Sequence, residues 1–233
     1  MQDLIDEKEL EEMAKAGLHF GHDVSRVHPK MKPFIIGMRN NIHVIDLSQT
    51  YFHLKKAQEF LEQAAKENKL ILFVGTKPQT RELLKGFAQE LGYPYVVEKW
   101  LGGTFTNFDV LKRRIDYYKD LKEKFEAGYF QKYTKKEQAM IAKELKKLSN
   151  RLEGLLKLDR LPDVVFVLDL KENYLTVKEA KEKNIPVVGI CDTNASPEWA
   201  DYPIPANDDS ITSVSYILEK IKQAILKGRQ SNQ

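Results

Sequence analysis

The sequence contains a single cysteine, Cys191, among 233 residues. One thiol cannot form an internal disulfide, which excludes the disulfide-stapled class of secreted domains and favours a reducing compartment. The chain also lacks a run of about 18 apolar residues, the length that a membrane-spanning helix needs. Its first residues, MQDLIDEKEL, are acidic and polar, whereas a secretory signal begins with a basic and then an apolar stretch. We therefore expect a cytoplasmic location.

Catalytic nucleophiles and bases are also scarce. Histidine is absent after His53, and no Ser or Cys stands in a nucleophile-elbow pattern. Asp169 and Asp192 follow candidate strands, where active sites of α/β enzymes form. However, short polar side chains at such places commonly stabilise turns and cap helices, and we interpret Asp208 or Asp209 as the cap of a helix starting near residue 210. The sequence therefore predicts a protein that is not an enzyme.

Positive charge is unevenly distributed along the chain. Residues 1–16 carry two Lys against six Asp and Glu, whereas residues 17–43 carry four Lys and Arg against one Asp. Residues 100–162 hold fifteen Lys and Arg against nine Asp and Glu. Basic segments of this kind are expected where one side of a protein faces a polyanion such as RNA.

Apolar runs rich in β-branched residues alternate along the chain with amphipathic helical patterns. The candidate strands lie at 42–45, 70–74, 95–97, 164–168 and 187–190, and the helical patterns at 48–67, 78–91, 175–184 and 210–228. Several of the runs are continuously apolar, as expected for parallel strands covered on both faces. This alternation predicts an α/β fold with a doubly wound parallel sheet.

The segment from residue 105 to 158 breaks this alternation, because it contains no candidate strand. Apolar residues recur at steps of three and four, and those from Ile141 to Leu155 step 4-3-4-3, which is heptad spacing. Thr134 and Glu137 have the spacing of a capping box, so a second helix should begin there. We predict an antiparallel αα-hairpin, a coiled coil.

The predicted hairpin divides the chain into two units. Residues 1–104 and 159–233 form one α/β domain, with an acidic N-terminal helix at 1–16, and residues 105–158 are inserted into it. The paired glycines that precede the hairpin permit close backbone approach, and we expect Thr106 to cap its first helix.

The segment from Gly17 to Asn41 combines basic, aromatic and amide side chains with prolines and glycines. Prolines and glycines disfavour a regular helix, so we expect an ordered loop. Such a loop offers phosphate donors and stacking surfaces together, which is typical of RNA recognition. Its histidines at 19, 22 and 28 have no further ligands at a fixed spacing, and we therefore expect no metal and no other cofactor.

The turn from Gly75 to Arg81 follows a strong candidate strand and precedes a helical pattern. A helix that begins after such a turn favours anions, so Lys77 and Arg81 are candidates for binding a phosphate. The turn lacks both the P-loop pattern and the dinucleotide-binding glycine pattern. An enzyme that handles a sugar phosphate at this turn, with Asp169 or Asp192 in its pocket, is an alternative. An adaptor whose hairpin binds another protein is a third.

Several short motifs, considered together, are specific to one family. They are AGLHFGH at 16–22, PKMKP at 29–33, FVGTK at 73–77, WLGGT at 100–104, LPD at 161–163, IPV at 185–187, DTN at 192–194 and IPANDDS at 204–210. In these motifs and their order the chain resembles the bacterial-type small-subunit ribosomal protein family S-two, over about residues 5–229.

The resemblance implies a Rossmann-like sheet with a protruding coiled-coil hairpin and no enzymatic turnover. It also implies binding to small-subunit ribosomal RNA, contact with neighbouring small-subunit proteins, and help in recruiting the large messenger-binding ribosomal protein. The residues that we expect to contact RNA are Arg26, Lys30, Lys32, Arg39, Asn40, Lys77, Arg81, Arg113 and Arg114.

Overall fold

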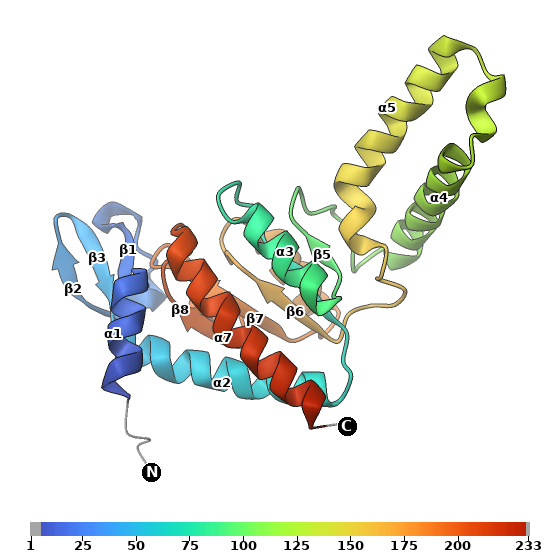
Figure 1. Ribbon diagram of the computed structural model, residues 1–233. Coiled ribbons are helices and arrows are strands. Elements are labelled where there is room, and N and C mark those ends of the chain that lie inside the picture. The colour runs from blue at the N-terminus through green and yellow to red at the C-terminus, as the bar shows by residue number, and fades with distance from the viewer. Residues whose placement is uncertain (1–5, 232–233) are drawn as a thin grey trace.

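A computed structural model describes residues 6–231 (Figure 1). Its main sheet has five parallel strands in the order β5-β4-β6-β7-β8. They are β4 (Ile71–Val74), β5 (Tyr95–Val96), β6 (Val164–Val167), β7 (Val187–Cys191) and β8 (Tyr202–Pro205). The predicted parallel sheet is confirmed, and β8 is an addition. Its sequence, YPIP, holds two prolines, which lack the backbone donor of a central strand but are tolerated on an edge strand.

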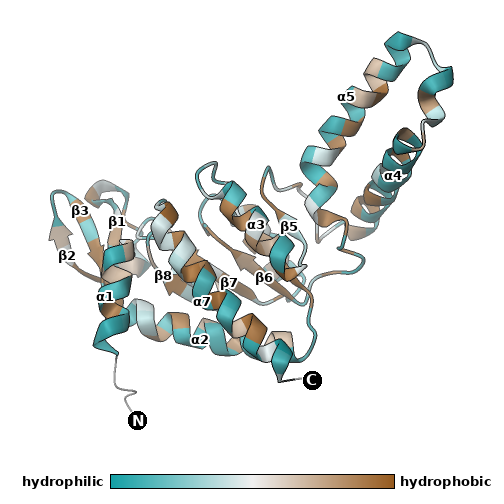
Figure 2. Cartoon of the chain, viewed as in Figure 1, coloured by the Kyte–Doolittle hydropathy of each residue, from teal (hydrophilic) through white to brown (hydrophobic). Residues whose placement is uncertain are grey.

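Helices cover both faces of this sheet, as expected for the α/β class. Alternate residues of β4 point to opposite sides, so Ile71 and Phe73 belong to one apolar core and Leu72 and Val74 to the other. The strands and the inward helix faces are accordingly the apolar parts of Figure 2. The helices of the two faces are α1 (Glu7–Ala16), α2 (Leu47–Lys66), α3 (Arg81–Leu91) and α7 (Ile211–Gln230) on the first, and α6 (Tyr174–Glu182) on the second.

A second, antiparallel sheet occupies the N-terminal region, and here two predictions were wrong. Its strands are β1 (Phe20–Asp23), β2 (Ile35–Arg39) and β3 (Ile42–Ile45), in the order β1-β3-β2. The run at 42–45 is thus the centre of this small sheet and not a strand of the parallel one. The segment 17–41, expected to be a loop, contains two strands and two 3₁₀ turns, η1 (Val24–Arg26) and η2 (Pro29–Phe34).

The two residues of its turn favour the β2–β3 hairpin. Asn40 and Asn41, the two residues between the strands, both have positive φ, at 50° and 63°. Two-residue hairpin turns need this conformation, and asparagine adopts it more readily than most residues. The Asn-Asn pair between Arg39 and Ile42 was therefore the available sequence signal.

Between β5 and β6 lie two helices, α4 (Phe108–Glu126) and α5 (Lys135–Leu152), joined by η3 (Tyr129–Lys132). They extend away from the sheet in Figure 1, and we call α4, η3 and α5 the arm. The predicted capping box of Thr134 and Glu137 is confirmed, since each side chain bonds the backbone of the other residue. None of the described helices is long and apolar enough to cross a membrane.

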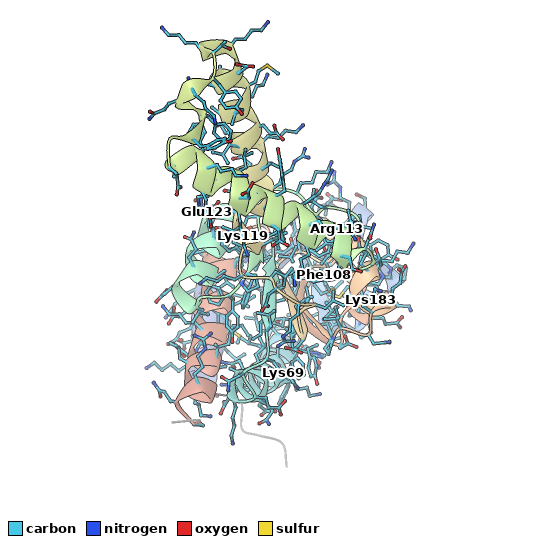
Figure 3. The ribbon with its side chains drawn as sticks, turned by 90° about the vertical axis from the view of Figure 1, so that its right-hand side faces the viewer. Lys69, Phe108, Arg113, Lys119, Glu123 and Lys183 are labelled. Carbon is cyan, nitrogen blue, oxygen red and sulfur yellow. The ribbon has the colours of Figure 1, made fainter. Side chains whose placement is uncertain are left out.

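The two arm helices are buried to different extents. In α4, Leu111, Ile115, Tyr118 and Leu121 are buried, whereas in α5 only Leu152 is. The α5 residues at heptad spacing before Leu152 are half-buried. Many of the exposed side chains of the arm are charged, such as Arg113, Lys119 and Glu123 of α4, which Figure 3 labels.

Candidate functional site

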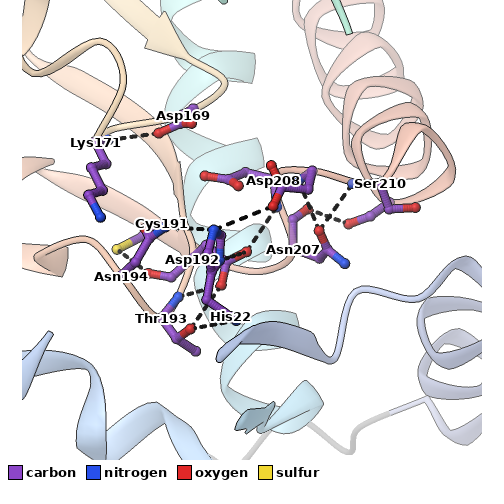
Figure 4. Close-up of polar contacts among 12 residues, drawn as sticks. His22, Asp169, Lys171, Cys191, Asp192, Thr193, Asn194, Asn207, Asp208 and Ser210 are labelled. Carbon is purple, nitrogen blue, oxygen red and sulfur yellow. Dashed lines mark hydrogen bonds and ion pairs between the residues drawn. The ribbon is translucent and has the colours of Figure 1, made fainter. Parts of the chain in front are cut away.

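Polar side chains gather where the strand order of the parallel sheet reverses. From β4 the chain proceeds to β5 on one side, and β6, β7 and β8 then extend the sheet on the other side of β4. In open α/β sheets the carboxyl ends of strands at such a reversal form a natural crevice. Lys77 follows β4, Asp169 follows β6 and Asp192 follows β7, so this topology brings them to one edge. Figure 4 shows Asp169, Asp192 and Asp208 there.

Lys77 lies at the centre of this cluster. Its Nζ is 2.6 Å from Asp169 Oδ2, 2.6 Å from Asp208 Oδ1 and 2.7 Å from Asp209 Oδ1, and its side chain is only 16% exposed. Burial lowers the pKa of Lys77, but Asp208 and Asp169 outweigh it and raise the pKa well above its ordinary value. Burial, together with Asp192 and Asp169, also raises the pKa of the Asp208 carboxyl. The ammonium group thus holds together carboxylates that would otherwise repel one another.

His22 connects the small sheet to this cluster. Its Nδ1 lies 3.1 Å from Asp192 Oδ2, and its Nε2 lies 3.4 Å from Asp209 Oδ2. The hydrogen bond to Asp192 raises the pKa of the imidazole above its ordinary value. The backbone N–H of His22 donates to Thr193 Oγ1 at 2.8 Å, and a side chain on the neighbouring Gly21 would collide with Thr193. Glycine is therefore required for β1 to lie this close to the end of β7.

Four side chains of the cluster present ligand atoms of the kind that divalent cations use. One atom each of His22, Asp192, Asp208 and Asp209 lies within 4.8 Å of the others. This group joins His22 to three carboxylates from the C-terminal part of the chain, and His19 and His28 are not part of it. Because Lys77 already contacts Asp208 and Asp209, these carboxylates have a positive partner within the protein.

The structure corrects two predicted caps. Neither Asp208 nor Asp209 caps α7, whose N-cap residue Ser210 makes no side-chain capping bond; Asn207 Oδ1 accepts hydrogen bonds from the backbone N–H groups of Asp209, at 2.9 Å, and Ser210, at 3.1 Å. The Asp208 carboxylate contacts Lys77 instead. Thr106 does not cap α4 either, because its hydroxyl points to Glu179 Oε2 at 3.3 Å.

Glu179, which the sequence did not single out, organises the base of the arm. This buried carboxylate accepts hydrogen bonds from Trp100 Nε1 at 3.1 Å, Gly103 N at 2.8 Å and Phe105 N at 2.9 Å. Burial raises the pKa of Glu179, but the backbone hydrogen bonds from Phe105 and Gly103 outweigh it, and the net pKa is lowered. The glycine-rich segment before α4 is therefore tied to α6 through one side chain.

The predicted RNA contacts fall into three groups. Arg26, Lys30, Lys32, Arg39 and Asn40 belong to the turns and strands of the small sheet and are exposed. Lys30 pairs with Glu198, whereas Lys32 and Arg39 form no ion pair within residues 6–231.

The other two groups differ from each other in whether their cations are paired with carboxylates. Lys77 is enclosed by aspartates, and Arg81 Nη1 lies 2.8 Å from Glu98 Oε1. Arg113 and Arg114 lie in α4 with exposed side chains and, among the described residues, without an ion-pair partner. The structure therefore separates free cations from neutralised ones, a distinction that the sequence could not supply.

Comparison of the sequence with known proteins identifies a family. The sequence model described as "Ribosomal protein S2" matches residues 13–228. The small ribosomal subunit protein uS2 of Coprothermobacter proteolyticus is 46% identical over 96% of this chain and 84% of its own length. The protein of the same name from Dictyoglomus turgidum is 46% identical over 94% of this chain and 89% of its own. The uS2c protein of Emiliania huxleyi is 44% identical over 96% and 98%.

These relatives are of similar length and match the chain across both the sheet and the arm. The match confirms the resemblance in the short motifs, and it supports a structural role in the ribosome rather than an enzymatic one. The chain belongs to the bacterial-type ribosomal protein S2 family.

Proposed function

We propose that this protein is a constituent of the small ribosomal subunit that binds small-subunit ribosomal RNA through the turns of its small sheet. The supporting observation is the set of exposed cations there, of which Lys32 and Arg39 form no ion pair with any residue from 6 to 231. Unpaired cations release counterions from RNA when they bind phosphates, which supplies most of the affinity. Lys77 and Arg81 contribute less, since carboxylates already neutralise them.

The test is binding of the full chain to labelled small-subunit ribosomal RNA as salt is raised. Substituting Lys32→Gln and Arg39→Gln together should weaken binding and reduce the slope of log affinity against log salt by about two. A matched control, Lys8→Gln with Lys15→Gln, removes two exposed lysines from the acidic α1 helix and should leave the slope unchanged. Equal effects of the two double variants would contradict the proposal.

We also propose that the small sheet helps to recruit the large messenger-binding ribosomal protein. Ile36 and Met38 of β2 are 69% and 71% exposed and border a hollow of about 290 Å³ that Lys32 also lines. Neighbouring apolar side chains this exposed mark interaction surfaces. Ile36→Ser with Met38→Ser should lower the amount of that protein on purified small subunits, whereas Tyr174→Ser with Leu175→Ser, a pair of neighbouring exposed apolar residues on α6, should not.

The arm, in this proposal, is a coiled-coil hairpin formed by residues 105–158 and inserted into the α/β domain. The support is the heptad spacing of α5 and the half-burial of Leu145 and Leu148 on its inner side. Leu145→Asn should then reduce the helical circular dichroism signal and the melting temperature. The neighbouring exposed Lys146→Asn is the control, and a similar loss from both would contradict a coiled coil.

A further inference from the structure

Between α4 and α5 lies a groove of about 900 Å³. Lys143, Lys147 and Arg151 line it on α5, and Arg114 and Tyr117 line it on α4. Tyr133 lies at the outer end, where α5 begins, and Leu101 at the base. The groove therefore extends along the arm, and four cations, two carboxylates and several apolar side chains line it.

The three α5 cations are unusual in their spacing. Lys143, Lys147 and Arg151 are four residues apart, so they form one row on the helix surface, about 6 Å apart along its axis. Like charges at this spacing repel and destabilise an isolated helix. In the part of the chain that the structure describes, neither these three nor Arg114 form an ion pair. The row therefore lowers the stability of the helix and has no compensating partner within the protein.

The two carboxylates of the groove, Glu137 and Glu144, offset only part of this charge, because four cations line the same groove. Glu137 belongs to the capping box with Thr134, at 2.9 Å from its backbone nitrogen. Glu144 Oε1 accepts a hydrogen bond from the Tyr117 hydroxyl at 3.1 Å. The groove therefore keeps a positive field, which suits an anionic ligand.

Aromatic rings stand beside the cations. Tyr117 is 49% exposed and Tyr133 is 38% exposed, and the bond to Glu144 holds the Tyr117 ring in place. Tracks of positive charge combined with exposed rings are the usual means of binding single-stranded nucleic acid, in which the backbone follows the cations and bases stack on the rings. A duplex keeps its bases stacked on one another and so cannot offer them to these tyrosines.

We propose that the groove between α4 and α5 binds a single-stranded segment of RNA. Its phosphates lie along Lys143, Lys147 and Arg151, and its bases stack on Tyr117 and Tyr133. This inference rests on the proposed RNA-binding function and adds to it a second site, with a preference for unpaired RNA. An acidic peptide would satisfy the cations but would not need two exposed rings, so RNA accounts for more of the groove.

The test uses the full chain and labelled oligoribonucleotides, one a single strand of about twelve nucleotides and one a hairpin duplex of the same length, with binding followed by fluorescence anisotropy. The variant K143Q/K147Q/R151Q should bind the single strand at least tenfold more weakly, with the salt slope reduced by about two. The control K119Q/K135Q/K146Q removes the same charge from exposed arm residues outside the groove and should change affinity by less than about threefold.

A second variant, Tyr117→Leu with Tyr133→Leu, tests stacking. It should weaken single-strand binding about tenfold and leave duplex binding unchanged. Circular dichroism spectra of all variants establish that α4 and α5 are intact. Equal losses in the two triple variants, or wild-type binding as tight for the duplex as for the single strand, would overturn the groove proposal. If those results came with unchanged, salt-dependent binding of ribosomal RNA through Lys32 and Arg39, the proposed function would stand without the groove.

Discussion

The lysine in the crevice at the sheet edge is largely buried and paired, whereas the lysines in the groove of the arm are exposed and unpaired among the described residues. Lys77 is buried among Asp169, Asp208 and Asp209, and each of its contacts is shorter than 3 Å. Lys143 and Lys147 are exposed, aligned with another cation, and unpaired among the described residues. A buried charge persists only when it is paired, whereas an unpaired surface charge remains available to a partner. We therefore expect the first cluster to contribute to stability, whereas the second lines the groove that we propose for binding.

The largest loss of stability is expected from Lys77→Met. Removal of the ammonium leaves buried carboxylates without a positive partner, which typically costs about 3–5 kcal/mol. Urea unfolding followed by circular dichroism measures this change. Lys143→Met, which removes a lysine of the arm, should stay within about 0.5 kcal/mol of the unsubstituted chain. If the two variants unfolded at the same urea concentration, the comparison between the two regions would fail.

A smaller effect is expected from Glu179→Gln, which weakens the connection between α6 and the base of the arm. Hydrogen bonds to a charged group contribute about 1.5–3 kcal/mol, and the amide retains only part of this. Glu182→Gln, an exposed position of the same helix, is the matched control and should be neutral.

The Glu179 contribution should depend on pH in one direction. Because folding lowers its pKa below the ordinary value of 4.5, its stabilisation is fully present above that value and is lost as the pH falls through the lowered pKa. The stability difference between the unsubstituted chain and Glu179→Gln should therefore shrink as the solution is acidified below that value. A difference that grew in acid would show that Glu179 is not held as a carboxylate.

The smallest expected effect is an increase in stability. Lys143→Glu replaces the repulsion between Lys143 and Lys146 or Lys147, three and four residues later, by attraction, and each pair is worth about 0.2–0.5 kcal/mol. The melting temperature should rise slightly while single-strand RNA binding falls. Lys143→Gln, which removes the repulsion without adding an attraction, is the control and should stabilise less. A loss of stability on Lys143→Glu would mean that Lys143 is paired within the protein.

Local patterns were sufficient for much of the fold. The continuous apolar runs located β4, β6 and β7, and the spacing of Thr134 and Glu137 located the start of α5. The small sheet and β8 were missed because glycine, proline and asparagine mark loops and turns as well as hairpins and edge strands. Which of these they form depends on the chain that packs beside them, and short-range patterns do not contain that information.

The cluster around Lys77 was beyond sequence reasoning for a different reason. Lys77 and Asp208 are 131 residues apart, and no local pattern distinguishes a lysine that will be buried from one that will bind RNA. The strand ends did predict that Asp169 and Asp192 lie at one edge, but not that a lysine of the neighbouring turn lies between Asp169 and Asp208. Glu179 was missed likewise, because a glutamate on an amphipathic helix usually faces solvent.

The contact between β1 and Thr193 has a consequence for folding during synthesis. The His22 backbone reaches a hydroxyl 171 residues further along the chain, so the small sheet cannot dock until β7 has left the ribosome that synthesises it. Until then Met31, which is fully buried in the folded chain with its sulfur 3.6 Å from that of Cys191, has no core to pack into, and a nascent chain in this state is open to misassociation. Docking of the N-terminal region is therefore a late event in folding.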